Sequence, residues 1–178
     1  MHLLEALLAA GQRVTSLDNF ATGHRENLRQ VERAVGARAW KRQRFVAGRN
    51  VDLAACRAAC AGADIVLHQA ALGSVPRSIA DPIPTHTTNV TGFVNMLEAA
   101  REAHVRRFVY ASSSSAYGDH AGLPKTEDAT GDALSPYAAS KAASDHLVRA
   151  YHHTYGLPVT TSNCSNNYGP YQFPEKLI

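Results

Sequence analysis

The stretch DIVLHQAA, residues 64–71, joins an apolar run of strand length to a group of small residues. Residues 64–67 predict a buried strand, and the small residues after it mark the strand's carboxyl end, the edge at which α/β proteins bind ligands. Outward from this strand, helix-like and strand-like segments alternate along the chain. Such alternation is typical of an α/β protein with a parallel sheet and helices on both faces.

The same patterns give approximate bounds for the other elements. Helices are expected at residues 2–10, 24–34, 52–61, 86–103 and 137–155. Strands are expected at residues 13–17, 44–46, 64–67, 107–110 and 158–161, with a loop at 68–78. The chain has no internal repeat and no linker, so we expect one domain over residues 1–178.

The composition argues against several classes of protein. With 45% hydrophobic and 19% charged residues, the chain has the balance of an ordinary globular protein. Its formal net charge of +3 is too small to argue for nucleic-acid binding. No run reaches the roughly 20 apolar residues of a membrane span, and the histidines and cysteines form no metal-ligand spacing. We expect no nucleic acid, membrane or metal partner, and free thiols at Cys56 and Cys60 in a reducing cytoplasm.

The segment SPYAASK, residues 135–141, places a tyrosine and a lysine four residues apart at the start of a predicted helix. Residues at this spacing share a helix face, so the Tyr137 phenol and the Lys141 ammonium can point into one cleft. A nearby cation favours phenolate, which makes a tyrosine a usable proton acceptor near neutral pH. Alone the pair is a weak signal, because any tyrosine and lysine can fall at this spacing.

A run of four serines lies upstream, in SSSSAYG at residues 112–118. A serine hydroxyl, a tyrosine and a lysine are the groups needed to take a proton from a sugar alcohol while hydride leaves for a nicotinamide. We therefore interpret the serine run and the Tyr–Lys pair as parts of one site.

The end of the predicted strand 13–17 carries an acid and an amide, Asp18 and Asn19. In dinucleotide-binding folds an acid here accepts hydrogen bonds from the adenosine ribose and favours NAD over NADP. A surface Asp-Asn turn explains the pair equally well.

Two further segments are expected to lie beside the cofactor. Next to His68, the small side chains of Ala70 and Ala71 let a ligand approach the backbone at the carboxyl end of a strand. Asn89, in the predicted helix 86–103, is expected to bond loop backbone beside the site.

These residues resemble the extended short-chain dehydrogenase/reductases that act on nucleotide sugars, and the resemblance covers nearly the whole chain. Segments 68–78, 112–120, 122–125 and 134–137 resemble the UDP-N-acetylglucosamine (UDP-glucose) 4-epimerases of polysaccharide biosynthesis. Segments 139–149 and 163–177 resemble the dTDP-glucose 4,6-dehydratases instead. The chain reads as a mosaic that changes near Tyr137.

The resemblance implies a Rossmann-like doubly wound parallel sheet, NAD as cofactor and a nucleotide sugar as substrate. In both families a tyrosinate takes the sugar 4-hydroxyl proton while the C4 hydride goes to NAD. A dehydratase must also remove the C5 proton and the C6 hydroxyl, which needs a base and an acid. That family uses an Asp-Glu pair, and the matching positions here are Ser114 and Ser115. We therefore favour an epimerase, with the dehydratase as the alternative.

The resemblance gives each candidate a role. Catalysis is expected of Tyr137, Lys141, Ser113 and Ser114, and NAD binding of Asp18, Asn19, His68, Ala70, Ala71 and Asn89 together with Tyr137 and Lys141. Substrate binding is expected of Ser74, Ser115, Asn166, Asn167, Lys176 and Leu177.

Three departures accompany the resemblance. The family's first strand and glycine-rich turn do not precede residues 2–10, and its carboxyl-terminal substrate lobe is absent. Arg49 stands where the family has an acid that bonds adenine. Loss of a central strand should leave a gap in the sheet and expose strand edges. We expect a truncated NAD-binding domain, a fragment of an epimerase-like enzyme that is inactive alone.

Other classes stay open. The absent glycine turn favours a non-catalytic NAD-binding or scaffold protein, whereas the Tyr137–Lys141 pair opposes it. A recombined reading frame without a stable fold is a third possibility. By resemblance, a homodimer would form through helices 86–103 and 137–155.

Overall fold

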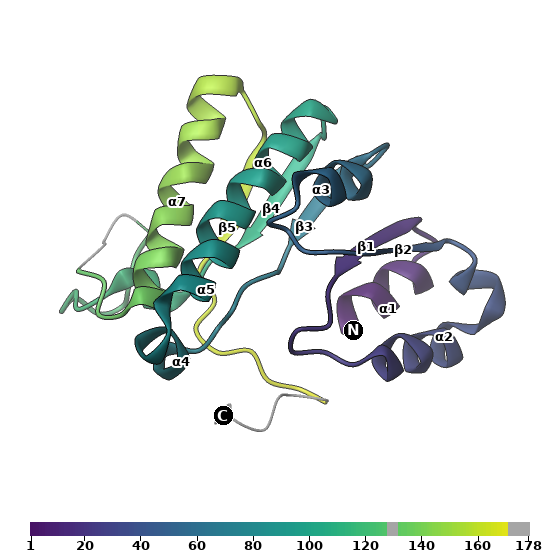
Figure 1. Ribbon diagram of the computed structural model, residues 1–178, viewed down its shortest axis with the longest axis horizontal. Helices are drawn as coiled ribbons and strands as arrows, with labels where there is room; N and C mark the ends of the chain where they lie inside the picture. The colour runs from purple at the N-terminus through teal and green to yellow at the C-terminus, as the bar shows by residue number, and fades with distance from the viewer. Residues whose placement is uncertain (128–131, 171–178) are drawn as a thin grey trace.

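The computed structural model describes residues 1–127 and 132–170. Strands and helices alternate along this part of the chain (Figure 1). The strands are β1 Val14–Asp18, β2 Gln43–Ala47, β3 Ile65–His68, β4 Arg107–Ala111 and β5 Val159–Ser162. The α-helices are α1 His2–Ala9, α2 Arg25–Trp40, α3 Leu53–Cys60, α4 Val75–Ala80, α5 Pro82–His86, α6 Gly92–Glu102 and α7 Pro136–Tyr155. A π-helical turn, η1 Thr87–Thr91, joins α5 to α6, and a 3-10 turn, η2 Ser114–Tyr117, follows β4.

The strands form two parallel sheets rather than one. Strand β1 pairs with β2, while β3, β4 and β5 pair in that order. Across the described residues no hydrogen-bonded ladder joins β1 to β3. The expected gap in a parallel sheet is therefore confirmed, and it lies between β1 and β3.

The first sheet has helices on both faces, and the second sheet packs against α6 and α7. Val14 and Leu17 are three residues apart in β1, so their side chains point to opposite faces. Val14 packs against the cluster of Leu4, Leu8 and Val31 from α1 and α2. Leu17 packs against the larger cluster that α3, α6 and α7 form with β3 and β4. Figure 1 shows this division, with α1 and α2 beside β1 and β2, and α6 and α7 along the second sheet.

Three predicted bounds were wrong. The loop expected at 68–78 contains the start of α4, which Ser74 caps by accepting a hydrogen bond from the Arg77 amide at 3.4 Å. Proline is tolerated in a first helical turn, so Pro76 does not prevent this helix. Helix α2 continues to Trp40 beyond an interruption at Gly36, where φ is +78°. The helix expected from residue 86 begins earlier, because α5, η1 and α6 follow one another without a break.

Within residues 1–127 and 132–170, no helix is both long enough and apolar enough to cross a membrane. In the same part of the chain, no group of three or more His, Cys, Asp or Glu side chains is placed to hold a metal ion.

Candidate functional site

The candidate site lies at the carboxyl edge of the strands. Each sheet is parallel, so the carboxyl ends of β3 and β4, at His68 and Ala111, face one edge of the second sheet, and Asp18 lies at the carboxyl end of β1 in the first sheet. The start of α7 approaches this edge from the side of the second sheet. The predicted cofactor and catalytic residues therefore converge from four elements that are distant in the sequence.

The first turn of α7 fixes the backbone of Tyr137. Ser135 is the N-cap and accepts a hydrogen bond from the Ala138 amide at 3.1 Å, and Pro136 follows it. The Tyr137 amide donates to the Oγ of Ser78 in α4 at 3.1 Å. The Tyr137 hydroxyl lies 4.0 Å from the position that a Cβ atom on Gly73 would take. The phenol is therefore held beside the loop that follows β3.

Lys141 lies one turn further along α7 and is 4% exposed. Its Nζ donates to the Ala111 carbonyl at the end of β4 at 2.7 Å and lies 4.6 Å from the centre of the Tyr110 ring. Burial lowers the pKa of the Lys141 ammonium to about 8, and the negative charge of Asp145 opposes this shift. The lysine is therefore a buried cation at the carboxyl edge of β4.

The serine run turns directly after β4. Ser113 caps η2, and its Oγ accepts a hydrogen bond from the Ser115 amide at 3.2 Å. The Ser114 amide donates to the Cys164 carbonyl at 3.0 Å, which ties this turn to the segment after β5. Ser113, Ser114 and Ser115 are all half-buried. The predicted hydroxyl groups therefore lie at the same strand edge as Lys141.

Asn89 connects the loop after β3 to α7. It lies in the π-helical turn and is 3% exposed. Its Oδ1 accepts from the Leu72 amide at 2.8 Å, and its Nδ2 donates to the Leu72 carbonyl at 3.3 Å and to Ser140 Oγ at 3.0 Å. The Ser144 hydroxyl donates to the Asn89 carbonyl at 2.9 Å. The expected bonding to loop backbone is confirmed, whereas direct NAD binding by Asn89 stays a prediction.

Asp18, the last residue of β1, and Asn19 both stabilise a local turn. Asp18 Oδ1 accepts from the Phe20 amide at 2.7 Å, and Asn19 Oδ1 accepts from the Ala21 amide at 3.0 Å. Phe20 has a φ of +56°, and the two Asx-type bonds support that turn. Both residues are exposed, so Asp18 remains accessible to a ribose hydroxyl.

The histidine of the predicted cofactor loop is buried rather than exposed to the site. His68 is 5% exposed and packs among Phe93, Phe108 and Tyr110, with ring centroids 5.1, 5.9 and 6.1 Å away. Burial lowers the pKa of His68 to about 3, and the Lys141 charge adds to the effect. Its backbone, rather than its neutral ring, borders the site. Ala70 is exposed and Ala71 half-buried, so the small residues do lie at the surface of this edge.

The predicted substrate residues are not all placed together. Ser74 is 8% exposed, and its hydroxyl caps α4. Asn166 and Asn167 are exposed in the segment after β5. Lys176 and Leu177 lie outside the described residues.

Sequence reasoning missed several groups at this site. Ser78, Gly73 and the Ala111 carbonyl contact or adjoin the Tyr–Lys pair, and only the three-dimensional fold brings them there. Asp145 was also missed, although a signal was present. The four-residue spacing of Tyr137 and Lys141 continues to Asp145, which therefore lies on the same face of α7.

Comparison with known proteins identifies the family. The family model described as "NAD dependent epimerase/dehydratase family" matches residues 1–178, and the chain belongs to this family. Its members are NAD-dependent enzymes, and the Rossmann-like fold described above agrees with the match.

The relatives include both predicted classes. A dTDP-glucose 4,6-dehydratase from Xanthomonas campestris pv. campestris is 52% identical over 125 residues, which cover 65% of this chain and 36% of that relative. Among solved structures, the dTDP-glucose 4,6-dehydratase DesIV from Streptomyces venezuelae, with NAD bound, has a TM-score of 0.88 and 40% identity, covering 99% of this chain and 55% of DesIV. The UDP-glucose 4-epimerase from Thermus thermophilus, in complex with NAD, has a TM-score of 0.83 and 36% identity, covering 97% of this chain and 53% of the epimerase. The chain thus spans about half the length of these structures.

Proposed function

We propose that this chain carries the catalytic residues of a nucleotide-sugar 4-epimerase acting on a UDP-hexose or a UDP-N-acetylhexosamine. The observation that carries the proposal is the turn after β4, where residues 112–115 supply hydroxyl groups beside the Tyr–Lys pair. Epimerisation at C4 needs one proton acceptor and hydrogen bonds that align the 4-hydroxyl. Tyr137 and Ser113 supply these groups.

Some of the residues at the carboxyl ends of the strands are suited to binding NAD. The exposed Asp18 carboxylate, at the end of β1, suits the ribose hydroxyls of the adenosine, and the Lys141 ammonium at the end of β4 suits the ribose on the nicotinamide side. Exposed Ala70 and half-buried Ala71 leave room for close approach of a ligand to the backbone. NAD, when bound, supplies the acceptor for the hydride of C4.

Side chains of this chain would then accept and return the proton of the sugar 4-hydroxyl. Tyr137 takes the proton of the sugar 4-hydroxyl on its phenol oxygen and returns it at the end of the cycle. The buried Lys141 charge stabilises the phenolate. Ser113, with Ser114 and Ser115 nearby, hydrogen-bonds the sugar O4 and keeps it in line with Tyr137. The 4-keto sugar turns over in the site before it is reduced on its other face, so no net oxidation occurs.

The serines also argue against dehydration of the sugar. Loss of water across C5 and C6 requires a base for the C5 proton and an acid for the departing hydroxyl. Ser114 and Ser115 occupy the turn where the resembled dehydratases have their Asp-Glu pair, and a serine hydroxyl is a very poor acid or base near neutral pH. A carboxylate-free turn therefore supports C4 chemistry without elimination.

A dTDP-glucose 4,6-dehydratase is the second candidate, because relatives with that name are 43 to 52% identical over the aligned part of the chain. The two candidates differ in how solvent hydrogen enters the product. In D₂O an epimer keeps its mass, whereas a dehydrated sugar loses water and gains deuterium at C5, because C6 receives the hydride that left C4 and C5 receives a solvent proton. Incubation of the chain with NAD and either UDP-N-acetylglucosamine, UDP-glucose or dTDP-glucose, followed by mass spectrometry, separates them. A 4-keto-6-deoxy product would refute the epimerase proposal.

A graft tests the serines without relying on turnover by this chain. Replacing the matching turn of the Xanthomonas dTDP-glucose 4,6-dehydratase by SSSSAYG should abolish formation of the 4-keto-6-deoxy product. Oxidation at C4, followed as reduced nicotinamide absorbance on addition of dTDP-glucose, should persist. The same graft with phenylalanine at the position that matches Tyr137 is the control for the proton acceptor, and it should lose oxidation at C4 as well. Continued dehydration by the graft would show that the serines do not decide between the reactions.

We also propose a homodimer through the helices that contain residues 86–103 and 137–155. An apolar groove of about 440 Å³ lies there, lined by Ile83, Val90, Ala139 and Ala143 with neighbouring residues, and Ile83 is 70% exposed. Light scattering should give a dimer for the wild type and a monomer for Ile83→Glu. A cytoplasmic location, which fits the free cysteines, stays a prediction.

A further inference from the structure

A carboxylate lies one helical turn beyond the lysine of the Tyr–Lys pair. Asp145 follows Lys141 on α7 at the spacing by which Lys141 follows Tyr137, so the three side chains share a face. Asp145 Oδ1 is buried, and in the described structure it has no hydrogen-bond partner. Buried carboxylate oxygens are nearly always paired, so an unpaired one calls for an explanation.

Two hydroxyl groups of β4 and the following turn lie beside this carboxylate. The Ser112 hydroxyl stabilises the ionised Asp145, although the pair falls outside ideal hydrogen-bond geometry. Burial and the Asp145 charge raise the pKa of the Tyr110 hydroxyl, whereas the hydroxyls of Ser144 and Ser112 lower it. Tyr110 also presents its ring face to the Lys141 ammonium at 4.6 Å. Asp145 and Lys141 thus lie against the same segment, the end of β4.

The charges around this pair come from several elements. The titratable and charged groups near Lys141 and Asp145 are His68 of β3, Tyr110 of β4, Tyr137, His146 and Arg149 of α7, and Glu127 of the preceding loop. For Lys141, the charge of Asp145 opposes the effect of burial. Burial itself raises the pKa of Asp145, whereas Ser112, Lys141 and Arg149 favour its ionised form.

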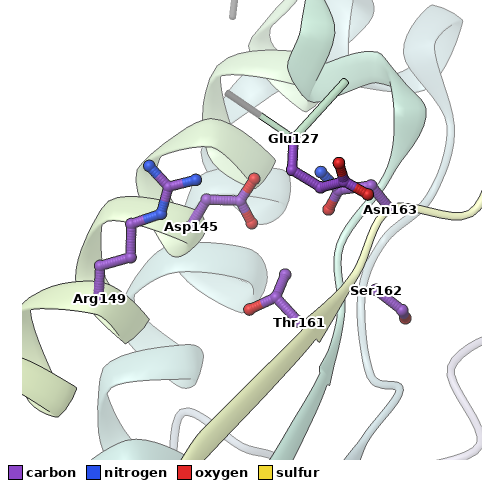
Figure 2. A pocket seen from close by; sticks show the side chains of 6 residues that line it. All are labelled: Glu127, Asp145, Arg149, Thr161, Ser162 and Asn163. Atoms are coloured by element: carbon purple, nitrogen blue, oxygen red, sulfur yellow. The ribbon is translucent and has the colours of Figure 1, made fainter. Parts of the chain in front are cut away.

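The carboxylate borders a polar cavity to which α7 and β5 both contribute. This cavity of about 190 Å³ is lined by Glu127, Asp145, Arg149, Thr161, Ser162 and Asn163. Figure 2 shows Asp145 and Arg149 projecting from α7 toward it, with Thr161 of β5 below and Glu127 opposite. Access to this polar cavity and the nearby Arg149 charge allow Asp145 to remain ionised while its Oδ1 lies buried.

We propose that Asp145 is a positioning residue, whose carboxylate keeps the Lys141 side chain an ammonium ion held between the Ala111 carbonyl and the Tyr110 ring. The inference rests on the proposed function, because it is there that a charged Lys141 stabilises the Tyr137 phenolate. Without Asp145, the buried amine would keep the Ala111 carbonyl and the Tyr110 ring but would lose the negative charge that opposes its burial. It would then lose its proton at a lower pH and cease to support the phenolate near neutrality.

The test measures Lys141 itself and needs neither cofactor nor substrate. The chain has four lysines, at positions 41, 125, 141 and 176, so the NMR signals of lysine labelled at Cε can be assigned with Lys141→Arg. In Asp145→Asn, the titration midpoint of Lys141 should fall by about one pH unit, the lower end of the effect of an opposite charge. Asp145→Glu should restore most of the wild-type midpoint.

The control is Asp64→Asn, which removes an aspartate that is 72% exposed and paired with Arg106 at 3.3 Å. This variant should leave the Lys141 midpoint unchanged. If Asp145→Asn does not fold, Asp145→Ser provides the same test with a smaller side chain. An unchanged midpoint in a folded neutral variant would overturn the proposal. Because the midpoint is read without turnover, a failure of epimerase activity would not be mistaken for this result.

Discussion

His68 is a basic side chain that the fold keeps neutral. Its pKa of about 3 in the folded chain lies below the ordinary value of 6.5, so the unfolded chain binds a proton that the folded chain does not. The stability that comes from a neutral His68 is therefore fully present above about pH 6.5 and is lost as the pH falls toward 3.

We predict that His68→Phe reduces the loss of folding stability as the pH falls below neutral. In the wild type, His68 should lower the free energy of unfolding by up to about 1.4 kcal/mol for each pH unit below its pKa in the unfolded chain. Phenylalanine fits an aromatic cluster and does not titrate, so the variant should lose less stability between neutral pH and pH 5. Urea unfolding at a series of pH values measures the difference, and His153→Phe, at an exposed position, is the control. Parallel curves for His68→Phe and the wild type would contradict the prediction.

For single residues, the sequence predicted which side chains share a helix face better than it predicted their burial and their contacts. The spacing of Tyr137 and Lys141 was sufficient to place both on one face of α7, because helix geometry is local. The burial of His68 and the contact of Lys141 with the Ala111 carbonyl depend on β3, β4 and α7 packing together. No local pattern carries that information.

Among the helices, α6 begins with a glycine, Gly92, that is needed because a neighbouring side chain leaves no room for a Cβ atom, not because of its backbone conformation. Gly92 begins α6, and a Cβ atom there would lie 2.3 Å from the side-chain carbon of Asn50. Asn50 is 8% exposed and donates to the Thr88 carbonyl at 2.8 Å, while its own carbonyl accepts from Asn95 at 3.0 Å. Asn50 therefore links the loop after β2 to η1 and α6.

Gly92→Ala should destabilise the chain, although alanine is the better helix former. Forcing a methyl group against a packed amide costs about 1–3 kcal/mol, which outweighs the roughly 1 kcal/mol of helix propensity that alanine gains. In an Asn50→Ala background the clash disappears, so the same substitution should become neutral or stabilising. A double-mutant cycle by urea unfolding measures this reversal. Equal effects in both backgrounds would rule out the steric explanation.

Element types were predictable wherever the apolar pattern was long, as in α7, and wherever a strand was short and bounded by polar residues, as in β3. The predicted bounds of helices were wrong where a proline or a glycine can belong either to a loop or to a helix. Pro76 was placed in a predicted loop but lies in the first turn of α4, and the helix expected to end at residue 34 continues beyond Gly36. The π-helical turn at Thr87–Thr91 has no pattern of its own, because it depends on Asn50 and Asn89 bonding to other parts of the chain.

For the whole molecule, the division of the sheet separates two hydrophobic clusters of unequal size. The first is built on Leu4, Leu8 and Val31 around a two-stranded sheet. The second extends over α3, α6 and α7 and a three-stranded sheet. Two paired strands are marginal without further support.

Native-state hydrogen exchange should therefore report two levels of protection. Amides of β1 and β2 should exchange through a partial opening that leaves β3, β4 and β5 protected, because no ladder crosses from β1 to β3. Leu8→Ala should increase exchange in the first unit alone, whereas Phe93→Ala should increase it throughout the second. A single protection level across all five strands would show that α3 couples the two sheets into one cooperative unit.

The bonds of Asn89 have a consequence for the thermodynamics of binding. The side-chain amide of Asn89 holds the loop after β3 and α7 together in the chain without ligand. Ordering a flexible loop on binding costs conformational entropy, and a preorganised loop avoids most of that cost. Calorimetry should therefore find a smaller entropic penalty for a dinucleotide in the wild type than in Asn89→Ala, in which the loop must be ordered at the moment of binding.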